Sequence, residues 1–155
     1  MTEDRIRSEI RGADTVVISV TVEVPRERIF RAFTDPETLA TWFWPQRFGT
    51  RFVCDLRPGG AFGIHADGLP AGQDMGVTGV YQAFEAPARV AMSWQWTGES
   101  AVSHVAVELS RVGENRTDVV VRHSANPSTT ARDDHEQGWR DCLGRLVETY
   151  DHANG

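Results

Sequence analysis

Hydrophobic and polar residues alternate through the middle of this 155-residue chain, from about residue 50 to residue 124. A period of two residues is typical of strands with one buried and one solvent-facing side. The segment RVAMSWQW shows the pattern most clearly, with Val90, Met92, Trp94 and Trp96 on one face. Short connections such as RPGG, EAPAR and RVGENR separate the strands, so neighbouring strands should pair antiparallel. We therefore predict a run of about six strands here.

A strand and two short helices should precede this region. Residues 15–24, TVVISVTVEV, alternate as a half-buried strand does, and Pro25 ends the pattern. Pro25 suits the first turn of one helix, while Asp35 followed by Pro36 suits the N-terminus of a second that ends at Pro45. The i, i+3, i+4 spacing of the second helix places three residues on its apolar face: Leu39, Trp42 and Phe43.

The chain should end in its longest helix, which we predict over residues 133–151. Asp133 and Asp134 are its N-cap candidates. Arg140, Arg145 and Glu148 lie off its apolar stripe and should be exposed. The stripe comprises Trp139, Cys142, Leu143, Leu146, Val147 and Tyr150. Such a stripe must be buried, and a curved antiparallel sheet wrapped around the helix would bury it, which gives an α+β fold.

Composition excludes several function classes. All sixteen basic residues are arginine, and 22 acids give a net charge of -6, which disfavours nucleic acid as a partner. We expect a charged N-terminal extension over residues 1–14 and a single domain over residues 15–151. The extension does not resemble a secretory signal, and no run of eighteen apolar residues could span a membrane, so we expect a cytoplasmic protein. Cys54 and Cys142 are expected to be reduced thiols.

The sequence offers little catalytic signal. No GxSxG, phosphate loop or dinucleotide-binding fingerprint is present, and we predict no cofactor. The DDHE stretch at residues 133–136 is explained by helix capping, so we predict no metal site. His123 and His135 are the only candidates for an acid and base at neutral pH, since they could meet where the last strand passes into the helix. The alternative is that each forms local hydrogen bonds that fix the intervening loop.

Four segments carry a family resemblance: VPRERIFRAFTDPETLATWFWP, DLRPGGAF, GVYQAFEAPARVAMSW and HEQGWRDCLGRL. Together, over about residues 15–150, they resemble the family related to the C-terminal domain of the activator of heat shock protein 90 ATPase. This family lies within the START-like, birch-pollen-allergen-like helix-grip superfamily. Two positions depart from its pattern: Trp44 stands where a small residue is common, and Ala61 stands at or near a position that is often basic.

The resemblance implies a helix-grip fold. A curved antiparallel sheet of about six to seven strands would wrap around the long C-terminal helix, with two short helices after the first strand. It also implies a cavity between sheet and helix, which the superfamily uses for lipids, steroids, polyketides and other apolar molecules. We expect ligand contacts from the inward-facing residues and the aromatic segment after residue 40: Trp42, Trp44, Phe62, Ile64, Met92, Trp94, Trp96, His123 and Trp139.

Three functions follow as hypotheses. The first is binding of an apolar or aromatic, lipid- or polyketide-like small molecule, with no assigned chemistry. The second is a cochaperone-like module whose surface contacts a chaperone. The third is a cyclase, aromatase or hydrolase that uses His123 and His135 in the cavity. The sequence does not decide whether the protein forms a homodimer. Packing competes with ligand contact at Trp42, which should be mainly structural, whereas Trp44 should border the cavity entrance.

Overall fold

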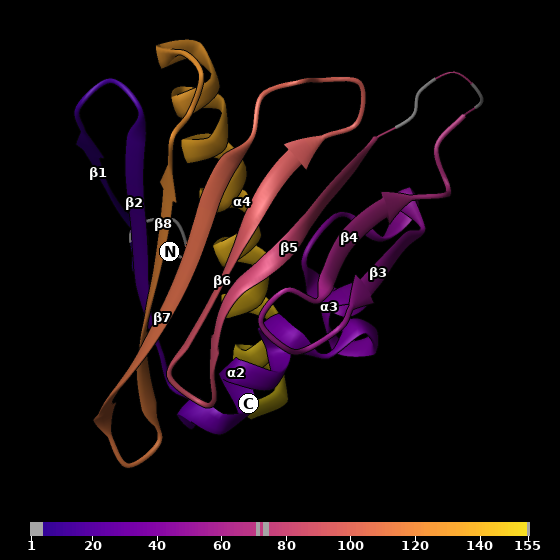
Figure 1. Ribbon diagram of the computed structural model, residues 1–155. Helices are drawn as coiled ribbons and strands as arrows, with labels where there is room; N and C mark the ends of the chain where they lie inside the picture. Colours follow the sequence, from indigo (N-terminus) through magenta and orange to yellow (C-terminus); the bar gives the residue numbers. More distant parts are fainter. Residues whose placement is uncertain (1–4, 71, 73–74, 155) are drawn as a thin grey trace.

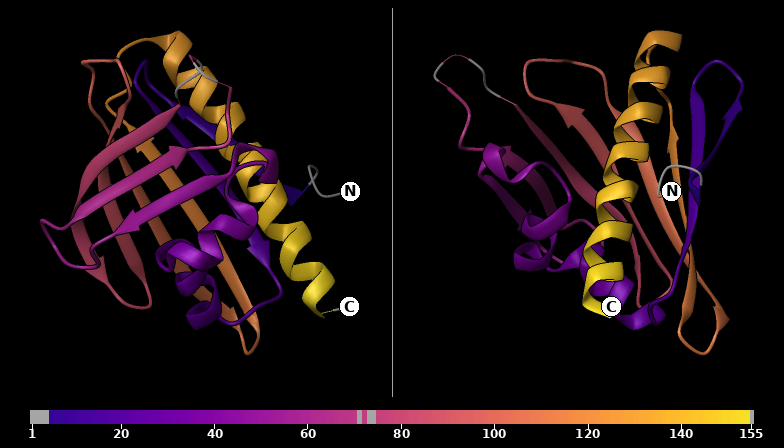
Figure 2. Two further views of the ribbon diagram at one scale, coloured as in Figure 1. Left: turned by 90° about the vertical axis from the view of Figure 1, so that its right-hand side faces the viewer. Right: turned by 180° about the vertical axis from the view of Figure 1, so that it is seen from behind.

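A single curved antiparallel sheet forms one layer of the protein, and a long C-terminal helix lies across its concave face (Figures 1 and 2). The computed structural model describes residues 5–70, 72 and 75–154. The eight strands follow the order β1-β2-β8-β7-β6-β5-β4-β3. Their bounds are β1 (Arg7–Arg11), β2 (Thr15–Val22), β3 (Thr50–Cys54), β4 (Ala61–Ala66), β5 (Gly76–Glu85), β6 (Arg89–Trp96), β7 (Ser103–Gly113) and β8 (Arg116–Ser124). The helices are α2 (Arg26–Thr34), α3 (Pro36–Trp42), the short 3-10 helix η1 (Gln46–Phe48) and α4 (Thr129–Asn154).

This arrangement confirms the predicted helix-grip fold and adds an edge strand. Strand β1 pairs with β2 from Arg7↔Ser19 to Arg11↔Thr15. The alternation pattern did not indicate β1, because most of its side chains are exposed and no buried row marks one face. Backbone hydrogen bonds to β2 hold β1 in place, and such bonds do not require apolar side chains. None of the described helices is long and apolar enough to cross a membrane.

Helix α3 begins as the sequence predicts. The Asp35 carboxylate accepts hydrogen bonds from the Thr38 backbone N–H, at 3.0 Å, and from the Thr38 hydroxyl. These bonds lower the pKa of Asp35, because they favour the charged carboxylate. At the other end of the helix, Trp42 is 1% exposed and its Nε1 donates to the Ala32 carbonyl at 2.9 Å. Trp42 therefore joins α3 to α2 from within the core.

Helix α4 starts one turn earlier than predicted. Its first turn is capped by Ser128, whose Oγ accepts from the backbone N–H of Ala131 at 3.0 Å. Asp133 and Asp134 lie inside the helix and are exposed, so the prediction that one of them is the N-cap was wrong. Ser128 is an equally good capping residue and lies nearer to the end of β8, so the helix begins there.

The apolar stripe of α4 is buried throughout, as predicted. Glu148 is exposed, but the prediction that Arg140 and Arg145 are exposed was wrong, because both are half-buried. Arg140 donates to Ser8 Oγ at 3.1 Å. Arg145 donates to the carbonyl oxygens of Trp42, at 3.1 Å, and Phe43, at 2.8 Å. Arg145 therefore supplies donors and positive charge at the C-terminus of α3, where helix carbonyls lack partners.

The packing of α4 gives a first testable result. Leu146 is 0% exposed, so Leu146→Ala should lower the free energy of unfolding by about 2 to 5 kcal/mol through lost burial and the cavity left behind. Urea denaturation measures the change. Glu148→Ala, an exposed position on the same helix, is the matched control and should change stability by less than about 0.5 kcal/mol. Equal effects of the two substitutions would show that α4 is peripheral.

Candidate functional site

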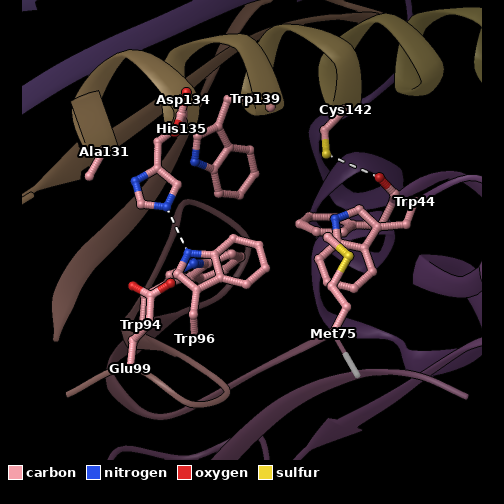
Figure 3. Close-up of a pocket in the computed structure, with 12 residues that line it drawn as sticks. Trp44, Met75, Trp94, Trp96, Glu99, Ala131, Asp134, His135, Trp139 and Cys142 are labelled. Atoms are coloured by element: carbon pink, nitrogen blue, oxygen red, sulfur yellow. Dashed lines mark hydrogen bonds between the residues drawn. The ribbon is translucent and has the colours of Figure 1, made fainter. Parts of the chain in front are cut away.

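A pocket of about 370 Å³ lies between the N-terminal half of α4 and the end of β6 (Figure 3). Helix α4 forms one wall, and the second wall comes from β6 and the turn that follows it. The segment after α3 and the residue preceding β5 close the remaining side. The lining residues are Phe43, Trp44, Met75, Trp94, Trp96, Glu99, Ala131, Asp134, His135, Gly138, Trp139 and Cys142.

Indole rings dominate this lining. Four of the five tryptophans in the chain border the pocket, and Trp42 is the exception. The rings of Trp44 and Trp96 are parallel, with an interplanar angle of 6° and centroids 6.0 Å apart. Trp94 packs between Trp96 and Trp139, with centroid distances of 6.0 and 5.6 Å. The pocket therefore presents flat aromatic faces from three separate segments of the chain.

Trp96 and His135 form one flat surface at the left of the pocket in Figure 3. Trp96 Nε1 donates to His135 Nε2 at 2.8 Å, and the ring planes differ by 8°. An indole N–H points along the plane of its own ring, so this bond with nearly parallel planes makes the two rings almost coplanar. The bond joins β6 to α4 across the pocket.

His123 lies next to His135 and is 0% exposed. The two imidazole rings stack at 3.9 Å with an interplanar angle of 19°. Trp139 Nε1 donates to His123 Nδ1 at 3.0 Å, so the His123 proton is on Nε2, where it is donated to Ser103 Oγ at 2.7 Å. By the same reasoning His135 carries its proton on Nδ1 and donates it to Asn126 Oδ1.

Both imidazoles are held in the neutral form. Burial lowers the pKa of His123 to about 2, and the neighbouring His135 makes the second-largest contribution to this shift. Burial also lowers the pKa of His135, against a smaller opposing effect of Asp134. Each ring accepts one hydrogen bond and donates another, so neither presents a free nitrogen to the pocket.

The predicted meeting of the two histidines occurs. Among the ring hydrogen bonds, only the bond from His135 to Asn126 lies in the loop between β8 and α4, as the alternative of local bonds requires. The other bonds are long-range and join the two rings to Ser103, Trp96 and Trp139.

Four of the nine residues expected to contact a ligand line the pocket: Trp44, Trp94, Trp96 and Trp139. The others face inward but lie outside the lining. They are Trp42, Phe62, Ile64, Met92 and His123, all buried in the core. Parity along a strand correctly gives the inner face, but the inner rows are longer than the pocket. Trp42, Phe62, Ile64 and Met92 belong to the hydrophobic core. His123 instead packs against His135 and Trp139 of α4.

Several lining residues carried no signal as ligand contacts in the sequence. Met75 and Glu99 lie outside the regular strands, where neither periodicity nor a motif marks them. His135 lines the pocket although the sequence indicated it as an acid or base or as a local hydrogen-bonding residue, and its place four residues before Trp139 on the helix stripe is the signal for a lining position. Cys142 donates to the Phe43 carbonyl, and burial raises the pKa of its thiol to about 12. It is therefore a poor nucleophile.

One buried donor in this region is without a partner. Trp94 Nε1 is sealed from solvent and forms no hydrogen bond to any described residue. The part of the chain that the structure describes contains no group of three or more His, Cys, Asp or Glu side chains that could hold a metal ion. Among the described lining residues, the pocket offers aromatic surface, two carboxylates and one imidazole whose two nitrogens are both hydrogen-bonded.

The family described as Activator of Hsp90 ATPase homolog 1-like protein matches residues 23–151. The chain belongs to this family. The resemblance inferred from the four quoted segments is thereby confirmed. No curated protein matches the sequence.

Solved structures place this member of the Activator of Hsp90 ATPase homolog 1-like family among proteins of the same fold. A Rhodobacter sphaeroides protein is 20% identical, covers 96% of this chain and 99% of its own, and has a TM-score of 0.80. An HSP90 activator from Plasmodium falciparum is 24% identical over 89% of this chain and 96% of its own, with a TM-score of 0.72. DynU16, from the dynemicin biosynthetic locus, is 22% identical over 89% of this chain and 47% of its own, with a TM-score of 0.73.

Proposed function

We propose that this protein binds a compact apolar or aromatic small molecule in the pocket between α4 and β6. The observation that carries the proposal is the lining of the pocket, in which four indoles and Phe43 surround about 370 Å³. Ligand sites are typically concave, mostly apolar and about 300 to 1,000 Å³ in volume, with few polar groups. An apolar cavity of about 150 Å³ holds benzene, so this pocket has room for roughly two aromatic rings.

A chaperone-contact function is supported by different observations. The family takes its name from an activator of the Hsp90 ATPase, and one structural neighbour is an HSP90 activator. This function would use the surface of the domain, so it does not account for the aromatic pocket. Small-molecule binding does account for it, and we therefore place it first.

An enzymatic function that uses the two histidines receives less support from the site. A general base needs a free lone pair within reach of its substrate. The lone pairs of His123 and His135 accept from Trp139 and Trp96 instead. Binding without chemistry is the simpler proposal for this arrangement.

Thermal unfolding with a library of one- to three-ring apolar compounds tests the binding proposal. A ligand present at about 100 times its Kd should stabilise the folded state by about 2.7 kcal/mol, so the Tm should rise with ligand concentration. Tryptophan emission should change in parallel, because four indoles line the site. A purified chaperone should produce neither change. A stable chaperone complex with no response to the library would reject small-molecule binding in favour of the surface function.

A further inference from the structure

The charges around the pocket all have one sign. Two carboxylates, Glu99 and Asp134, belong to the described lining, and none of the sixteen arginines does. Glu99 lies on the Trp96 side of the pocket, in the turn after β6, and Asp134 precedes His135 on α4 (Figure 3). Both residues are exposed, and across the described part of the chain neither carboxylate forms an ion pair or a side-chain hydrogen bond. Their negative charge is therefore not neutralised by the protein.

The aromatic walls, like the two carboxylates, favour a positively charged ligand. The face of an indole carries negative potential and attracts a cation within about 6 Å of the ring. Trp44 and Trp96 present parallel rings, Trp94 adds a third from β6, and Trp139 adds a fourth from α4. A cation in this pocket would meet both aromatic faces and carboxylates.

An anionic ligand would find few donors. The Trp96 N–H is bonded to His135, the Trp139 N–H is bonded to His123, and the Trp94 N–H is sealed from solvent. Among the described residues, Trp44 supplies the one indole N–H of the lining that is neither bonded nor sealed. The Cys142 thiol donates to the Phe43 carbonyl. A carboxylate or phosphate would lose its hydration with at most the Trp44 N–H to offset the loss, which is costly for a charge. It would also be repelled by Glu99 and Asp134.

We infer that the pocket selects a cationic aromatic ligand, an amine or quaternary ammonium attached to a system of about two rings. The inference rests on the proposed binding function and narrows it to one chemical class. The rings would lie among the indoles, and the cationic group would lie at the edge of the pocket near Glu99.

Three probes of similar size and different charge test the inference by isothermal titration calorimetry: 1-naphthylmethylamine, 1-naphthylmethanol and 1-naphthoate. At neutral pH the amine is a cation, the alcohol is neutral and the acid is an anion. We expect the amine to bind about tenfold more tightly than the alcohol, as a desolvated cation–π contact allows, and the acid to bind most weakly. The preference should weaken as salt is raised, since the carboxylates are exposed.

Charge-neutralising variants connect the preference to named residues. Glu99→Gln and Asp134→Asn, singly and together, should reduce the amine-to-alcohol affinity ratio several-fold and leave alcohol binding unchanged. Glu114→Gln is the matched control, because it removes the same charge from an exposed turn between β7 and β8, away from the pocket, and should leave the ratio unchanged.

The outcomes separate the two proposals. If the alcohol binds as tightly as the amine, or the acid binds best, the cationic preference is wrong while small-molecule binding stands. An amine preference that survives in the double variant would overturn the role of the two carboxylates. If none of the three probes binds and the broader library also gives no response, the binding function fails and this inference fails with it.

Discussion

Replacing Trp42 with alanine is expected to lower the free energy of unfolding by about 3 to 5 kcal/mol. The side chain is 1% exposed and packs edge-to-face against Phe33 and Phe43, at centroid distances of 5.1 and 5.3 Å. Its loss would leave a large cavity and an unpaired Ala32 carbonyl at the junction of α2 and α3. Denaturant unfolding of the variant measures the change.

The stability and ligand affinity of a Trp44→Gly variant should be compared with those of Trp42→Ala. Trp44 is 8% exposed and lines the aromatic pocket on one side and a second hollow of about 230 Å³ on the other. Removing the indole would join the two hollows and admit water, so the loss of stability should be smaller than for Trp42→Ala. The loss of ligand affinity should be large, because the parallel faces of Trp44 and Trp96 no longer bound the pocket.

Two results would contradict this assignment. If Trp44→Gly unfolds the protein as severely as Trp42→Ala, the indole is a core residue. If ligand binding is unchanged in a folded Trp44→Gly variant, the indole does not contribute to the site.

Acid is expected to destabilise the protein strongly below about pH 6.5. Burial holds the pKa of folded His123 near 2, whereas a histidine in the unfolded chain titrates near 6.5. The unfolded state therefore binds a proton that the folded state excludes. The stability contributed by neutral His123 is complete above about pH 6.5 and falls by about 1.4 kcal/mol per pH unit as the pH decreases. His135, whose pKa is also lowered, acts in the same direction.

Urea denaturation at pH 7 and pH 5 measures this effect as a loss of about 2 kcal/mol from His123 alone. The titratable groups that affect His123 are His135 on α4 and His104 on β7. His123→Gln should make the pH dependence shallower by about one proton, even though it also lowers stability at pH 7. His65→Gln, on β4 outside this hydrogen-bonded network, is the control and should retain the wild-type slope. An unchanged slope in His123→Gln would show that the ring is not held neutral.

The candidate site was only partly predictable from the sequence. Trp94 and Trp96 share a strand face and Trp139 lies on a helix stripe, so periodicity alone directed all three inward. Glu99 and Met75 lie outside any repeating pattern, and only the curvature of the sheet brings them to the pocket. The hydrogen bond between Trp96 and His135 joins residues 39 positions apart, a distance at which local spacing carries no information.

The sequence by itself determined the order of helices α2, α3 and α4 and of strands β2 to β8, the inner face of most of those strands and the buried stripe of α4. These properties follow from side-chain polarity at periods of 2 and 3.6 residues, which act locally along the chain. Only the tertiary structure decided which inward residues form a pocket and which form the core, and that Arg145 completes the end of α3. It also decided that His123 and His135 each accept a hydrogen bond from a tryptophan and stack on each other, so that neither ring has a free nitrogen. Burial depth, pKa and hydrogen-bond partners depend on what packs against a side chain from elsewhere in the chain, and no local pattern specifies that neighbour.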